Sequence, residues 1–245
     1  MTDPHQNLVI DFDSPLRRLP PGLSPEQSIT LDGIRHAAEV ATLAYRRLTQ
    51  ALTQIAIDPP EPATEQSADA MTAVYLDAWA IIDAVDRLRM LVKLLPMDEA
   101  TRASHDELDK ALQDVRSARN VSDHLAQRIS YVVAKGLPAF GALGWFTLTR
   151  EYGGFSCALI PGTFFEKLSA SLVNPAGKPF RPPTDMVTMF VGEHRVSLSE
   201  AMATGKTMVA GVEAGISQAV HAHGLEGKHM GADMTFRVEM EFHAD

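Results

Sequence analysis

The stretch RSARNVSDHLAQRISYVVAK, from Arg116 to Lys135, decides how the first half of this chain is interpreted. On a helix, where successive residues turn by about 100°, its apolar side chains form one stripe. That stripe consists of Ala118, Val121, Leu125, Ile129 and Val132. The opposite face gathers basic, acidic, amide and imidazole side chains, namely Arg116, Arg119, Asn120, Asp123, His124 and Gln127. This face is the first candidate for a functional surface.

The preceding residues have the apolar spacing of long helices. This spacing predicts one helix over Thr30–Ile57, which a proline-rich linker ends, and a second over Ala70–Leu95. Ser104 and Glu107 have the spacing of a capping box, which predicts the start of a third helix. Because the apolar stripe swings between Val115 and Val121, we expect a break near Ser117 and a fourth helix that begins near Asn120.

From Phe140 onward the pattern is that of strands. Trp145–Arg150 and Phe155–Ile160 flank a glycine-containing turn, which predicts a hairpin. A second hairpin is predicted for Met186–Val191 and Arg195–Leu198, and Ser197 or Ser199 then caps a helix that runs to about Val220. Alternating apolar and charged residues predict a last strand over Met234–Phe242.

The predicted fold class is therefore α+β, with an antiparallel helical bundle followed by a small antiparallel sheet and one helix. Residues 1–27 hold five prolines and are interpreted as an N-terminal arm. Residues 28–138 form the helical region and residues 139–245 the α+β region.

Composition limits the function classes. The net charge of −9 is spread along 245 residues, and no segment is strongly basic, so a broad electrostatic surface for nucleic acid is not indicated. Cys157 is the single cysteine, which excludes an internal disulfide and a cysteine-cluster metal site. The start, MTDPHQ, lacks the features of a signal peptide, and uncharged runs are too short to span a bilayer. We expect a cytoplasmic protein without membrane contact.

Two other motifs give weaker hypotheses. Gly205-Lys206-Thr207 is similar to the end of a phosphate-binding loop, but the earlier glycine of such a loop would be at Glu200. His221, His223 and His229 have spacings at which imidazoles bind zinc, yet they lie in a glycine-containing segment without a supporting cysteine. A solvated turn is the favoured interpretation, and we predict neither a metal nor another cofactor.

The residues Arg119, Asn120 and His124 resemble the signature of the HEPN superfamily, in which arginine and histidine lie four to six residues apart. The resemblance covers about residues 28–138, including the long helical hairpin. It implies an all-helical domain of the kind found in prokaryotic ribonuclease toxins and in RNA-processing or defence proteins. It also implies a homodimer with both motifs in one cleft, RNA as substrate, and an antitoxin or another protein as partner.

Elementary chemistry is compatible with this resemblance. A helix that begins near Asn120 would present free N–H groups to a phosphate, and Arg119 could hold the phosphate oxygens. His124 could transfer a proton at neutral pH, so that the 2′-hydroxyl of RNA attacks the phosphodiester without a metal. Catalytic roles therefore fall to Arg119 and His124, and supporting roles to Asn120, Asp123, Arg116, Gln127 and Tyr131.

Two alternatives remain beside the ribonuclease. The same face could bind a protein partner without catalysis, as a HEPN-like interaction or assembly module. The residues could also be an ordinary solvated helix face, on which Asp123 only caps the helix or pairs with Arg119.

Overall fold

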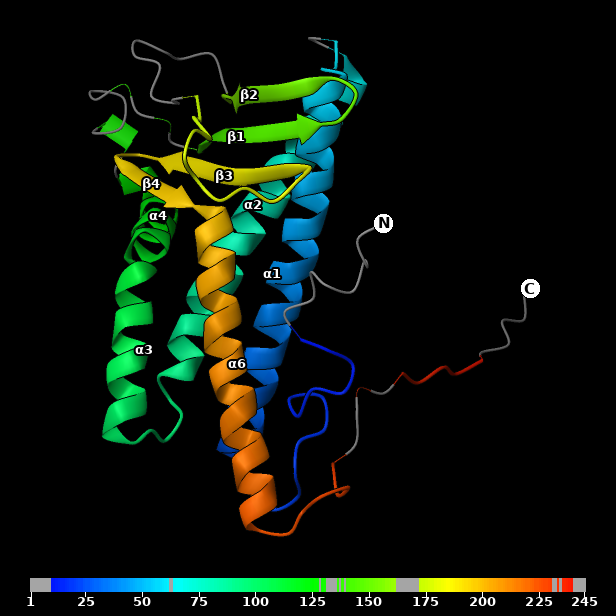
Figure 1. Ribbon diagram of the computed structural model, residues 1–245, viewed down its shortest axis with the longest axis vertical. Coiled ribbons are helices and arrows are strands. Elements are labelled where there is room, and N and C mark those ends of the chain that lie inside the picture. The colour runs from blue at the N-terminus through cyan, green and yellow to red at the C-terminus, as the bar shows by residue number, and fades with distance from the viewer. Residues whose placement is uncertain are drawn as a thin grey trace, which may run out of the picture.

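A computed structural model describes residues 10–61, 64–127, 129–130, 136, 138, 140–161, 172–230, 233 and 235–239. Long helices stand side by side, and a four-stranded sheet lies across one end of them (Figure 1). The strands run across the helix axes rather than along them (Figure 1). The predicted α+β class, with helices first and an antiparallel sheet with one further helix after them, is confirmed.

Helices α1 (Pro25–Ile57) and α2 (Glu65–Val92) form the predicted helical hairpin. Ser24 and Gln27 make a reciprocal capping box, which satisfies free N–H groups at the start of α1. The buried stripe of α1 includes Ile34, Leu48 and Leu52, and this stripe packs on α2. The hairpin is thus the element on which the other layers rest.

Helices α3 (Glu99–Ala111) and α4 (Gln113–Asp123) differ from the predicted ones in their boundaries. Helix α3 begins at Glu99 and not near Ser104; Asp98 caps it, since its carboxylate accepts a hydrogen bond from the Thr101 N–H at 2.8 Å. The break lies at Leu112, whereas Ser117 is inside α4. The expected kink is unnecessary because Val115, Ala118 and Val121 sweep only about 120° of the helix surface, within one broad buried face.

The sheet has the order β2-β1-β3-β4, and all neighbouring strands are antiparallel. Both predicted hairpins are confirmed: β1 (Ala142–Thr149) with β2 (Gly153–Leu159), and β3 (Thr184–Val191) with β4 (His194–Ser197). Leu143 lies opposite both Leu159 and Met189. Leu143 and Met189 belong to the core cluster that the sheet shares with the helices, and partly buried Leu159 packs against it.

Helix α6 (Leu198–Ala222) follows β4 directly, and the Ser197 hydroxyl caps it, as predicted. The predicted last strand is wrong for its described part, because residues 235–239 form no strand. Phe236 and Val238 are 82% and 80% exposed. Alternating apolar and charged residues give an extended segment one apolar and one polar face, but a β-strand also needs a neighbouring strand with which to form hydrogen bonds. Met234 and residues 240–242 lie outside the described part of the chain.

The predicted helical and α+β regions share one core. Its larger cluster combines side chains of α1, α2 and α4 with those of the strands and the start of α6. A second cluster holds the described part of the N-terminal arm, where Ile10, Leu16 and Leu19 are buried against α1, α2 and α6. The Met230 N–H also donates to the Leu19 carbonyl at 2.8 Å. The arm therefore packs along the bundle.

Helix α6 offers a simple test of this arrangement. A Cβ atom added at Gly211 or Gly215 meets nothing within 4 Å. We expect Gly211→Ala and Gly215→Ala each to raise the free energy of unfolding by about 0.5–1 kcal/mol, because alanine loses less backbone entropy in a helix. Urea unfolding followed by circular dichroism measures this change. Gly205→Ala is the comparison variant, because its added Cβ lies 3.4 Å from Leu88 and therefore adds a packing contact to the backbone effect. Destabilisation by both Gly211→Ala and Gly215→Ala would contradict the open space beside these two glycines.

Candidate functional site

The residues that resemble the HEPN signature lie at the C-terminal end of α4. His124 is the C-cap of this helix, and its N–H donates to the Asn120 carbonyl at 3.3 Å. The predicted helix start near Asn120 is therefore misplaced: Asn120 lies inside α4, and helical residues begin again only at Leu125, after the break at His124. The Asn120 N–H lies inside α4, where it belongs to the helical ladder and not to a phosphate site.

Arg119 is held by carboxylates. Its Nη1 atom donates to Asp86 Oδ2 at 2.7 Å, and its Nε atom lies 3.4 Å from Asp83 Oδ1 and 3.8 Å from Asp123 Oδ2. The hydrogen bond to Asp86 raises the pKa of Arg119 above its ordinary value, so the guanidinium stays charged. Pairing with Asp123, which the sequence left open, is observed.

Asp86 connects Arg119 to a larger ionic network. This buried α2 carboxylate also accepts from Arg89, at 2.9 Å from Nε and 2.8 Å from Nη2. Arg89 in turn donates to Asp109 of α3 at 2.9 Å, and Lys93 lies 2.8 Å from the same carboxylate. Burial alone would raise the pKa of Asp109, but the hydrogen bonds from Lys93 and Arg89 hold it below its usual value. The network joins α2, α3 and α4.

The remaining predicted site residues are solvated. Arg116, Asn120, Asp123, His124 and Gln127 are all exposed, and Tyr131 lies outside the described residues. The apolar stripe holds for Ala118 and Val121, which are buried, whereas Ile129 is 56% exposed. Ile129 comes after the helix break at His124. The apolar spacing of α4 therefore does not continue to Ile129, and this side chain is not buried with Ala118 and Val121.

The histidine segment gives no metal centre. His221 Nδ1 lies 3.0 Å from Glu226 Oε1, and His229 Nδ1 lies 3.1 Å from the Met230 carbonyl. Across the described residues, no group of three or more His, Cys, Asp or Glu side chains is placed to hold a metal ion. In the same part of the chain, no helix is long and apolar enough to cross a membrane.

A cavity at the N-terminal end of α6 was not predicted from the sequence. It has a volume of about 740 Å³, and its walls come from α1, α4, the segment before β3, β3, β4 and α6. We call it the α6 cavity. Its residues are scattered along the sequence without a local motif, and only the charged residues among 178–206 could have drawn attention to it.

The wall of the α6 cavity is shaped by a β-bulge. The register between β1 and β3 shifts between Gly144 and Phe146, and Met186 adopts a left-handed conformation with φ of 57°. Asp185 stabilises the bulge by accepting hydrogen bonds from the N–H groups of Met186 and Arg181, at 2.7 and 2.9 Å. Polar backbone and side-chain groups thus converge here because the regular ladder is interrupted.

A second hollow, of about 930 Å³, lies between α3 and α6 and is lined mainly by apolar side chains, with His105 among them. His105 is 6% exposed, and its Nε2 atom has no hydrogen-bond partner among the described residues. Burial of this nitrogen without a partner costs free energy, but the atom is itself shielded from solvent. It therefore gives the hollow no accessible polar anchor.

The ionic network makes a direct prediction. Asp86→Ala leaves Arg89 and Arg119 without their shared carboxylate, so we expect a loss of about 3–5 kcal/mol in the free energy of unfolding. Chemical denaturation measures this loss. Arg116→Gln, at an exposed residue one helical turn before Arg119, is the control and should change stability by less than about 0.5 kcal/mol. Equal stability of wild type and Asp86→Ala would contradict a structural role for the network.

Comparisons with family models, with curated proteins and with solved structures find no match to this chain. The resemblance to the HEPN superfamily therefore rests on Arg119, Asn120 and His124 and on their helical surroundings. The function has to be argued from the geometry of the described residues.

Proposed function

We propose that this chain is a non-catalytic HEPN-like assembly module that pairs with a second copy of itself. The observation that carries the proposal is that Arg119 is ion-paired with Asp83, Asp86 and Asp123. A phosphate would have to compete with these carboxylates for the guanidinium. Because like charges repel, the same carboxylates make the surroundings unfavourable for an RNA backbone.

The orientation of α4 supports the same conclusion. The C-terminal end of a helix carries the negative end of the helix dipole, and His124 sits at that end. A negative dipole end favours cations and disfavours phosphates. The free N–H groups of α4 itself lie at its opposite end, near Gln113, although further helical residues, 125–127, begin directly after His124.

Exposed apolar side chains adjoin the motif face. Trp79 Nε1 donates to the Phe140 carbonyl at 3.1 Å, so Phe140 lies beside α2, and its side chain is 64% exposed. Leu76, 61% exposed, lies one turn before Trp79, and Asp83 follows Leu76 after two turns on the same side of α2. The apolar pair Leu76 and Phe140 therefore borders the residues that hold Arg119.

A second copy fits this surface better than a strongly charged partner does. A twofold interface places the same patch on both subunits, so the patch must complement itself. This one carries both signs, with Arg116 basic and Asp83 and Asp123 acidic, around exposed Leu76 and Phe140. The same proposal places the chain in the cytoplasm, where a protein with a single cysteine and no disulfide is ordinary.

A ribonuclease is the second candidate, and one observation favours it. The His124 side chain is exposed and makes no hydrogen bond or ion pair with the described residues. It is thus free to accept a proton from a 2′-hydroxyl. Such a reaction requires Arg119 to leave Asp86, or another cation to stabilise the phosphate.

Both candidates are tested on purified protein. Light scattering after size exclusion should give a dimer for wild type and a monomer for Leu76→Asp, because a buried carboxylate opposes the apolar contact. Leu94→Asp is the control, since Leu94 is 69% exposed but lies just past the end of α2, about 25 Å from Leu76 along the helix axis, and should leave the dimer intact. A monomeric wild type at all concentrations would contradict the assembly module.

Incubation with mixed RNA in the presence of a chelator separates the candidates. The assembly module predicts no cleavage above the level of the His124→Ala variant. Cleavage by wild type that is lost in His124→Ala would establish the ribonuclease instead.

A further inference from the structure

We propose that the α6 cavity binds a phosphate-bearing small molecule of about the size of a mononucleotide. This site is separate from the α4 face, and the inference does not depend on the proposed assembly function. The cavity, of about 740 Å³, has a volume typical of small-molecule sites.

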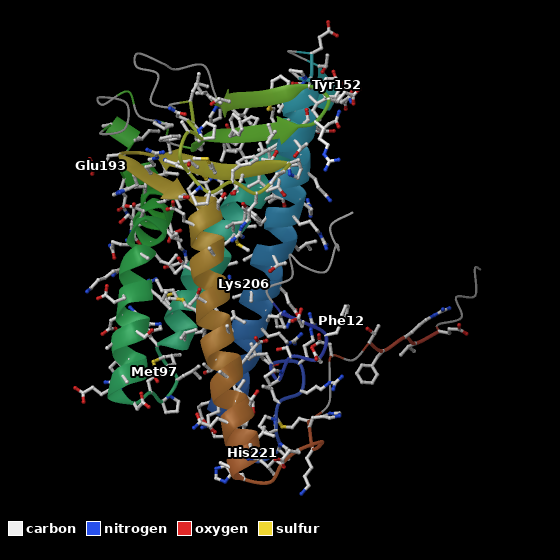
Figure 2. All side chains as sticks on the ribbon, viewed as in Figure 1. Phe12, Met97, Tyr152, Glu193, Lys206 and His221 are labelled. Carbon is white, nitrogen blue, oxygen red and sulfur yellow. The ribbon has the colours of Figure 1, made fainter. Side chains whose placement is uncertain are left out.

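Basic side chains converge on the α6 cavity from segments that are far apart in the sequence. Five basic residues line it, against three acidic ones, in a chain whose net charge is −9. The five come from α1, the segment before β3, β4 and α6, and they are Arg46, Lys178, Arg181, Arg195 and Lys206. Lys206 lies on α6 below the sheet, whereas His221 is at the far end of the same helix (Figure 2). The cavity is thus a local basic region.

These five side chains are free to meet an anion. None of them forms an ion pair with another described residue, and Arg195 only lies over the Phe190 ring at 5.8 Å. By contrast, Arg35, Arg89 and Arg119 are each held by carboxylates. Uncompensated cations around one cavity are the arrangement that an anionic ligand requires, and the planar guanidinium of arginine suits phosphate oxygens in particular.

The acidic residues of the cavity do not cancel this charge. The two oxygens of Asp185 accept from the N–H groups of Met186 and Arg181, at 2.7 and 2.9 Å, so its charge is already stabilised by the bulge. Glu200 lies in the first turn of α6, and Asp114 lies on α4. Both are exposed, as are all five basic side chains, so water screens both signs alike and the excess of basic residues around the cavity remains.

A pair of hydroxyl groups supplies one unused donor. The Val187 N–H has no ladder partner at the bulge and donates instead to the Ser199 oxygen at 3.0 Å. The same Ser199 oxygen lies 2.8 Å from the Tyr45 oxygen. Only one of the two hydroxyl hydrogens can be used between these oxygens. The other has no acceptor among the described residues, and Tyr45 and Ser199 both line the cavity. A phosphate oxygen is an acceptor of the required kind.

The Tyr45 hydroxyl keeps its hydrogen at neutral pH. Burial raises the pKa of Tyr45 to about 12 against the opposing effect of its hydrogen bond to Ser199. The tyrosine therefore acts as a neutral donor, and it adds no negative charge that would repel a phosphate. Donors and cations thus face the same space.

Isothermal titration calorimetry of the full chain, in a chelator at physiological ionic strength, tests the proposal with AMP, pyrophosphate and adenosine. We expect AMP and pyrophosphate to bind and adenosine to bind at least about tenfold more weakly, because its contacts lack the charged group. Equal binding of AMP and adenosine, or no binding of AMP and pyrophosphate at millimolar concentration, would overturn the proposal. Binding of an RNA oligonucleotide alone would overturn it as well, since it claims a small ligand.

Variants assign the binding to this cavity. Arg46→Gln and Arg181→Gln each remove one cation without breaking an observed side-chain contact, so both should fold and weaken AMP binding by about tenfold or more. Tyr45→Phe should weaken it by a smaller factor. Arg150→Gln, an exposed arginine in the turn between β1 and β2, is the matched control and should bind AMP as wild type does. An equal loss in Arg150→Gln, or none in Arg46→Gln and Arg181→Gln, would place the anion elsewhere.

Discussion

The shared carboxylate of Asp86 is the interaction on which the arrangement of the helices depends. It lies on α2, is 4% exposed, and accepts from Arg89 and Arg119 together. Such a buried group is costly unless both oxygens are paired, so α4 must stay where Arg119 can reach it. Arg89 extends the same constraint to Asp109 of α3. One buried charge thus fixes the position of two shorter helices on the α1–α2 hairpin.

The pairing of charges inside the protein also distinguishes the two polar regions of the molecule. On the α4 face, Arg119 is paired with carboxylates of the same chain, and the surface around it carries both signs of charge. In the α6 cavity the opposite holds, because the bulge at Met186 satisfies Asp185 through backbone N–H groups and leaves the arginines uncompensated. Whether a cation is paired inside the protein therefore separates an architectural arginine from one that is available to a ligand.

Local patterns predicted the elements well where the signal itself was local. Apolar periodicity gave the α1–α2 hairpin, the two β-hairpins and α6, and Ser197 was identified as a cap. The start of α4 was missed because Leu112, which separates α3 from α4, offers no side-chain cap to recognise. The last strand was overpredicted because alternation does not reveal whether a neighbouring strand exists.

The candidate sites depend on contacts that no spacing shows. Arg119 was predicted as a phosphate ligand, but its partner Asp86 lies 33 residues earlier and meets it only in the folded chain. A double-mutant cycle of Asp86→Asn and Arg119→Gln measures this contact most directly, through urea unfolding of the wild type, both single variants and the double variant. A structural pair predicts a coupling free energy of about 1–3 kcal/mol. A coupling below about 0.3 kcal/mol would mean that Arg119 is free for other chemistry, and would contradict the account.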